Sequence, residues 1–265
     1  MAYETILYDV AGPVATITLN RPKSYNALTL HALNEVARAF KNARSDSTVR
    51  AVILTGVGEG FCSGADLTEA GIDPDTFDIK EALRTGLNVV IAQIRSLEKP
   101  VICAINGVAA GAGASIPLAA DYRIASEKAG FVFAAFVNIG LIPDAGMTHI
   151  LPQLVGVGKA MELVLFADAR NRVSAEEAHK LGIVNRVVAH EDLMAETEAL
   201  AGKLAQMPTR TIGLTKRALY RAAQRSLADS LEYEAQLQSI AFGTTDFREG
   251  VAAFLEKRAP VFKGE

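Results

Sequence analysis

The sequence has no tryptophan, two cysteines and four histidines in 265 residues. Two cysteines are too few for a disulfide framework, and neither Cys62 nor Cys103 stands in a metal-ligand spacing. The histidines show no such spacing either, so no metal site is predicted. A chain with few cysteines and no disulfide framework is typical of a reducing compartment, so we expect a cytoplasmic protein.

The sequence also has no large excess of positive or negative charge. The formal net charge is -3 and the sequence pI is near 5.9, which predicts no general attraction to nucleic acid or to an anionic membrane. The first ten residues do not combine a basic region, an apolar stretch and a cleavage site, so we expect no signal peptide. Residues 101–120 carry no charge, but their glycines, proline and asparagine disfavour a transmembrane helix.

Half of the residues are hydrophobic and 22% are charged, which suits a packed globular chain. Residues 51–55 and 101–105 are continuous apolar runs, as expected for strands covered on both faces. A glycine-rich loop and then a helical pattern follow each run, an order that predicts parallel strands with helical crossovers. Both loops should therefore open at the carboxyl edge of one sheet.

Two further strands are predicted at residues 4–10 and 14–20, the second being rich in β-branched residues. From about residue 191 the strand signal fades, and four helical patterns succeed one another. We therefore expect an α/β core over residues 1–190 and a helical region over residues 191–265.

The glycine loops lack the motifs that bind phosphate or carry a nucleophile. Gly111-x-Gly113 leads to Ile116 and so does not complete G-x-G-x-x-G, and neither loop contains a P-loop lysine or a G-x-S-x-G serine. Two interpretations remain open. The small residues allow close packing of helix on strand, or they expose backbone N–H groups as an oxyanion hole.

Six segments resemble the crotonase, or enoyl-CoA hydratase/isomerase, superfamily, and they occur in the family's order over nearly the whole chain. They are "LNRPKSYNAL" (19–28), "GFCSGADL" (60–67), "INGVAAGAGASIPLAADYRIA" (105–125), "IGLIPDAG" (139–146), "SAEEAHKLGIVNRVV" (174–188) and "FREGVAAFLEKRAPVF" (247–262).

The resemblance implies a spiral of β-β-α turns and a C-terminal helical region that assembles trimers, often paired into hexamers. It implies an acyl-CoA thioester substrate, with coenzyme A as part of the substrate and no other cofactor. The thioester carbonyl would lie between the backbone N–H groups of Ala65 and Ala112. Residues 68–88 are expected to line the acyl pocket. Coenzyme A binding is assigned by motif match to Ala27, Ala65, Asp66, Leu67 and Gly111, and to Phe254 and Lys257, which match positions that reach a neighbouring subunit's coenzyme A.

Typical hydratases of the family use two glutamates, and the matching positions here are Ser115 and Phe136. Neither residue can act as an acid or base on water, so hydration is disfavoured. Asp144, in "LIPDAG", matches the place where the family's isomerases and aromatic-ring enzymes carry an aspartate. A turn-forming aspartate after proline is the alternative explanation.

The resemblance therefore implies an isomerase with Asp144 as its one proton shuttle. It would shift a 3-enoyl double bond to the 2-position or, like the family's phenylacetate-pathway enzymes, rearrange a ring epoxide of phenylacetyl-CoA. An enoyl-CoA hydratase of fatty-acid β-oxidation is the alternative. A hydrolase or dehalogenase is disfavoured because the chain lacks tryptophan and has no histidine at residues 79–98. A non-catalytic acyl-CoA- or RNA-binding relative stays open, with Arg217, Arg221 and Arg225 as its basic stripe.

Overall fold

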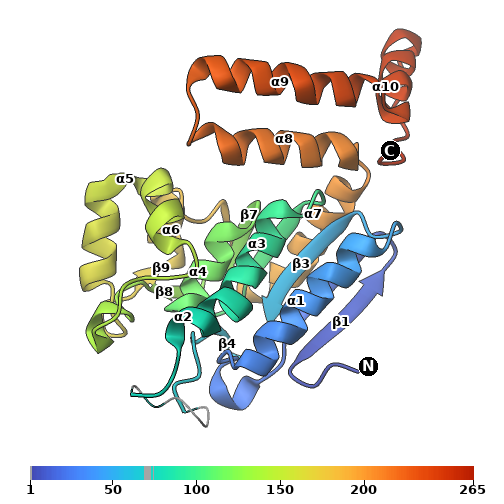
Figure 1. Ribbon diagram of the computed structural model, residues 1–265. Helices are drawn as coiled ribbons and strands as arrows, with labels where there is room; N and C mark the ends of the chain where they lie inside the picture. The colour runs from blue at the N-terminus through green and yellow to red at the C-terminus, as the bar shows by residue number, and fades with distance from the viewer. Residues whose placement is uncertain (1, 69–72, 74) are drawn as a thin grey trace.

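The computed structural model describes residues 2–68, 73 and 75–265 (Figure 1). Residues 69–72 and 74, part of the predicted acyl-pocket lining, lie outside the described residues. The strands are β1 (Ile6–Ala11), β2 (Val14–Leu19), β3 (Ala51–Gly56), β4 (Gly60–Cys62), β5 (Val101–Ile105), β6 (Val108–Ala110), β7 (Tyr122–Ser126), β8 (Gly130–Val132), β9 (Val173–Ser174) and β10 (Arg186–Val188). The α-helices are α1 (Leu30–Ser45), α2 (Ile79–Ala82), α3 (Asn88–Ser96), α4 (Ala112–Ala119), α5 (Met147–Phe166), α6 (Ala175–Lys180), α7 (Leu193–Ala205), α8 (Thr209–Ala222), α9 (Leu227–Phe242) and α10 (Thr245–Glu256).

The larger sheet has the strand order β1-β2-β3-β5-β7-β10, and all its neighbours are parallel except β1 and β2. Successive side chains of β3 point to opposite faces. Val52 and Leu54 join the core cluster that contains α1 and α3, whereas Ala51 and Ile53 pack with α7. Both faces are thus covered, which explains the continuous apolar run and confirms the predicted parallel strands.

The smaller sheet, in the order β4-β6-β8-β9, was not predicted from the sequence. Its first three strands each follow a strand of the larger sheet, and a helical segment comes next: β3, β4 and the segment from α2 to α3; β5, β6 and α4; β7, β8 and, after a short 3-10 turn, α5. This repetition is the β-β-α spiral that the resemblance implies, and the fold class is confirmed. The glycine loops supply β4 and β6, so both loops start at the carboxyl edge of the larger sheet.

The predicted boundary at residues 190 and 191 falls in a short 3-10 turn, His190–Asp192. The first helix after it, α7, covers the larger sheet through Leu193, Ala201 and Ala205. The remaining helices, α8 to α10, lie beyond the core in orange and red, with α8 beside α9 (Figure 1).

Polar contacts attach α8 to the core. Lys216 Nζ donates to Asp121 Oδ2 at 2.7 Å and to the Ile94 carbonyl at 2.9 Å. Arg50, directly before β3, donates to the Met207 carbonyl at 2.6 Å and to Thr209 Oγ1 at 2.9 Å. Charge-assisted bonds of this kind fix where α8 starts and how it lies on the core.

Helix α5 alone, among the described residues, is long and apolar enough to cross a membrane by length and composition. Gly156, with φ 76° and ψ 158°, breaks it into two arms. The second arm carries Lys159 and Glu162, which form an ion pair at 2.6 Å. The uncharged stretch 101–120 does not form one helix, since it contains β5, β6 and α4, as expected from its glycines.

Candidate functional site

Two glycines with positive φ turn the backbone just before the predicted oxyanion donors. Gly64 has φ 95° and precedes Ala65, and Gly111 has φ 52° and precedes Ala112. Ala112 is the first residue of α4, so its N–H has no acceptor within the helix. The Ala65 N–H likewise meets no acceptor among the described residues, although the carbonyl before it and the N–H after it are both hydrogen-bonded.

The two turns lie against each other. A Cβ atom built on Gly64 would lie 2.8 Å from the Ala110 carbonyl oxygen and 3.5 Å from the Ala112 nitrogen. A Cβ atom built on Gly113 would lie 2.1 Å from the Cys62 carbonyl oxygen. Close packing therefore requires glycine at both positions, and it also brings two unpaired N–H groups to one place. Close packing of the glycine loops is confirmed, and the geometry is compatible with the oxyanion hole, which stays a prediction.

The segment 21–28 closes over the first glycine turn. The Leu28 N–H donates to the Gly64 carbonyl at 2.8 Å, and the Asp66 N–H donates to the Leu28 carbonyl at 3.0 Å, so Ala65 lies between two backbone bonds. Asn26 Nδ2 donates to the Gly60 carbonyl at 2.9 Å. Residues 27 and 65–67, which are predicted to bind coenzyme A, thus gather along one seam.

The Asp66 carboxylate is occupied within the protein. Hydrogen bonds from the Thr68 hydroxyl and from Arg21 lower the pKa of this carboxyl. The predicted role of Asp66 in coenzyme A binding therefore rests on its backbone, and it stays a prediction. Leu67, 58% exposed, presents an apolar side chain beside it.

Asp144 lies on the loop between β8 and α5, and one of its two carboxylate oxygens has no partner. Its Oδ1 atom is buried and has no hydrogen-bond partner among the described residues. Burial raises the pKa of this carboxyl to about 6, against a weaker opposing contribution from its own N–H. The next two residues, Ala145 and Gly146, have φ of 52° and 77°. A strained turn thus holds a carboxylate with one buried, unpaired oxygen, an arrangement that is typical of functional sites.

The loop that carries Asp144 starts beside the second glycine turn. A Cβ atom built on Gly111 would lie 3.8 Å from the Phe136 ring, and the Phe136 carbonyl accepts the Leu141 N–H at 2.9 Å. The loop ends in α5, which packs on α4. Phe136 is 6% exposed and Ser115 is fully buried, its hydroxyl lying 3.3 Å from the Gly111 carbonyl. The two positions that match hydratase glutamates are thus filled by an aromatic ring and a small hydroxyl.

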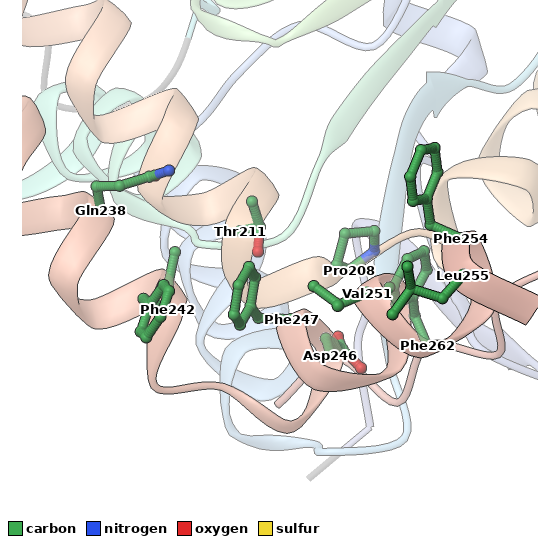
Figure 2. Close-up of a pocket in the computed structure, with 12 residues that line it drawn as sticks. Pro208, Thr211, Gln238, Phe242, Asp246, Phe247, Val251, Phe254, Leu255 and Phe262 are labelled. Atoms are coloured by element: carbon green, nitrogen blue, oxygen red, sulfur yellow. The ribbon is translucent and has the colours of Figure 1, made fainter.

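Phe254 and Lys257 lie apart from these residues, on α10 in the helical region. Phe254 is 82% exposed, and Lys257 caps the helix with φ 55°. Phe254 lines a largely apolar groove of about 400 Å³ between α8, α9 and α10 (Figure 2). The groove is also lined by Phe242, Phe247, Val251, Leu255 and Phe262.

The predicted stripe of arginines does not lie on a single helix face, because α8 ends at Ala222 and Arg225 lies in the turn before α9. Arg221 and Arg225 lie over the Tyr233 ring, with centroid distances of 5.3 and 4.2 Å, and Arg217 lies 3.4 Å from Glu98. These contacts favour an intramolecular role over nucleic-acid binding. No group of three or more His, Cys, Asp or Glu side chains converges as for a metal ion in the part of the chain that the structure describes.

Sequence reasoning missed two residues of this region, Arg21 and Asn26. Both belong to the segment "LNRPKSYNAL", which was quoted only for its resemblance. The signal was two polar side chains that flank a Pro-containing turn, and the turn leaves Tyr25 and Asn26 with φ of 49° and 60°. Because their partners lie about 35 to 45 residues further along the chain, spacing alone did not reveal the contacts.

Comparison with known proteins matches the chain over nearly its whole length. A family model described as enoyl-CoA hydratase/isomerase matches residues 9–265. The 1,2-epoxyphenylacetyl-CoA isomerase of Escherichia coli K12 is 42% identical over 264 residues, which are 99% of each chain. A probable enoyl-CoA hydratase of Rhodobacter capsulatus is 40% identical and is covered in full. The crystal structure of an enoyl-CoA hydratase subunit I from Geobacillus kaustophilus superposes with a TM-score of 0.91 at 37% identity over 99% of both chains.

Proposed function

Since the chain belongs to the enoyl-CoA hydratase/isomerase family, we propose that it is an acyl-CoA isomerase in which Asp144 is the one proton shuttle. The buried Oδ1 atom of Asp144, which has no hydrogen-bond partner among the described residues, carries this proposal. A buried acceptor without a donor costs folding free energy, so its presence points to a functional role, and burial makes this carboxylate a stronger base.

With a 3-enoyl-CoA, Asp144 removes a proton from C2 and the electrons move onto the thioester oxygen. The N–H groups of Ala65 and Ala112 stabilise that enolate oxygen, and α4 adds the positive end of its dipole. The same carboxylic acid returns the proton at C4, which yields the 2-enoyl-CoA. No atom is gained or lost, so one carboxyl group suffices.

The finer assignment is the rearrangement of a ring epoxide of phenylacetyl-CoA, supported by the 42% identity to the Escherichia coli enzyme of that name. Hydration is the second candidate, favoured by the 40% identity to a probable hydratase. Water addition needs a base for the water and an acid at C2, and Ser115 and Phe136 supply neither. We therefore place isomerisation first.

The test separates the two reactions by mass. We expect the protein to convert 3-hexenoyl-CoA into 2-hexenoyl-CoA without a mass change and to add little water to 2-hexenoyl-CoA, as followed by mass-resolved chromatography of the thioesters. Ring-epoxidised phenylacetyl-CoA is then compared as a substrate. Rapid hydration of 2-hexenoyl-CoA would contradict the proposal, because another group would then have to activate water.

We also expect a homo-oligomer, a trimer or a dimer of trimers. The groove beside Phe254 and the exposed apolar residues of α5, such as Val157 at 70% exposure, present apolar side chains to solvent, and clustered exposed apolar side chains are typical of protein–protein contacts. An assembly would bring Phe254 and Lys257 to a neighbouring subunit's coenzyme A. Light scattering after size-exclusion chromatography measures the mass, and a 28 kDa species at micromolar concentration would contradict this expectation.

A further inference from the structure

Arg21 connects the two segments that flank the Ala65 N–H. Its Nη2 atom donates to Asp66 Oδ2 at 2.9 Å, and its Nη1 atom donates to the Ala27 carbonyl at 2.5 Å. The Arg21 side chain is 26% exposed and that of Asp66 is 11% exposed, so the pair is largely shielded from solvent. The backbone N–H of Arg21 donates to Asn26 Oδ1 at 2.9 Å, so Asn26 helps to fix the backbone of Arg21.

These contacts surround Ala65 on both sides. Leu28 follows Ala27 and bonds the carbonyl before Ala65 and the N–H after it. Arg21 therefore contacts the residue before Leu28, through the Ala27 carbonyl, and the residue after Ala65, through the Asp66 carboxylate. On the Gly64 side the peptide also packs against the second glycine turn, whereas Ala65 is solvent-exposed, so on that side the Leu28 bonds and the Arg21 contacts hold its orientation.

We propose that Arg21 is a positioning residue that aims the Ala65 N–H at the thioester oxygen; the inference rests on the oxyanion hole of the proposed function. Arg21 reaches the reacting atoms only through Asp66 and Ala27. A planar guanidinium with several fixed donors can hold a carboxylate and a carbonyl together, whereas an ammonium on a flexible stem cannot reproduce both contacts in one geometry.

The substitution Arg21→Lys keeps the positive charge and removes the planar guanidinium that donates to both Asp66 and Ala27. We expect kcat for 3-hexenoyl-CoA at saturation to fall ~10- to 100-fold, because a misaimed donor loses part of the 10²- to 10³-fold effect of a whole donor. A second readout needs no turnover: the infrared band of the ¹³C-labelled carbonyl of bound hexanoyl-CoA. The wild-type protein should move this band to lower frequency, and Arg21→Lys should move it less at full occupancy.

Arg50→Lys is the matched control. The Arg50 side chain makes three hydrogen bonds, to Thr209, Phe262 and Met207, against two for Arg21, but Arg50 precedes β3 at the edge opposite the glycine turns. It should lower Tm without changing kcat or the carbonyl band. Asp66→Asn tests the pair from the other side and should act in the same direction as Arg21→Lys. If Arg21→Lys does not fold, Asp66→Asn serves as the test. The double variant, Arg21→Lys with Asp66→Asn, should lower kcat little more than the more harmful single substitution.

A wild-type band shift and wild-type kcat in Arg21→Lys, with only Tm lowered, would overturn the inference. Equal losses of kcat in the Arg21 and Arg50 variants would also overturn it, since the effect would then be global. If the wild-type protein does not isomerise 3-hexenoyl-CoA but still shifts the hexanoyl-CoA band, the proposed reaction fails while the role of Arg21 is decided by that band.

Discussion

Asp144→Asn is expected to lower kcat for 3-hexenoyl-CoA isomerisation by ~10²- to 10⁴-fold, the usual contribution of a general base. The amide has the shape of the carboxyl group but cannot accept a proton from C2. Substrate binding should change little, because the Ala65 and Ala112 N–H groups remain. Thioester chromatography over a range of substrate concentrations separates kcat from KM.

The pH dependence identifies the same carboxyl group. Burial raises the pKa of Asp144 to about 6, and only its ionised form can act as a base. We therefore expect kcat/KM for the wild-type protein to rise with pH through a midpoint near 6 and then to level off. The residual activity of Asp144→Asn should lack this rise.

Two controls accompany this substitution. Ionising a buried carboxyl whose folded pKa is raised opposes folding as pH rises from about 4 to 6, so the Tm of Asp144→Asn at pH 7 should not fall below that of wild type. Asp168→Asn changes a turn carboxylate that accepts the Arg170 N–H at 2.8 Å, and it should keep full activity. Full isomerase activity in a correctly assembled Asp144→Asn protein would refute the proton-shuttle role.

The larger sheet could be predicted from the sequence because its strands leave strong local patterns. β3 and β5 are covered on both faces and read as continuous apolar runs. The smaller sheet left no such pattern, since β4, β6 and β8 have three residues each and lie within glycine-rich or small-residue segments. Their pairing is fixed by the spiral that stacks them, which is a property of the whole chain.

Part of the candidate site could also be predicted from the sequence, and part could not. Ala65, Ala112 and Asp144 were found because short motifs around them resemble the family's motifs, and the structure adds that two N–H groups and one carboxylate oxygen are unpaired. The Arg21 contacts with Asp66 and Ala27 could not be read from spacing, because they depend on how the chain closes on itself. The roles of Phe254 and Lys257 depend on a neighbouring subunit and stay predictions.

Gly64→Ala is expected to lower kcat ~10- to 100-fold by opening the oxyanion hole. The new methyl group would lie 2.8 Å from the Ala110 carbonyl oxygen and 3.5 Å from the Ala112 nitrogen, so the two glycine turns must move apart. The N–H groups of Ala65 and Ala112 would then lie too far apart to bind one oxygen together, and a full loss of one donor would cost 10²- to 10³-fold. Steady-state kinetics with 3-hexenoyl-CoA measures the loss.

Gly182→Ala separates this steric effect from backbone strain. Gly182 has φ 77°, close to the φ of 95° at Gly64, but a Cβ atom there would meet nothing within 4 Å. Both substitutions cost about 1 to 2 kcal/mol of folding free energy for placing alanine at positive φ. Only Gly64→Ala also displaces a neighbouring backbone, so only it should lower kcat. If both variants lose stability and neither loses kcat, the two turns do not form the hole, and stabilisation of the enolate must come from other groups.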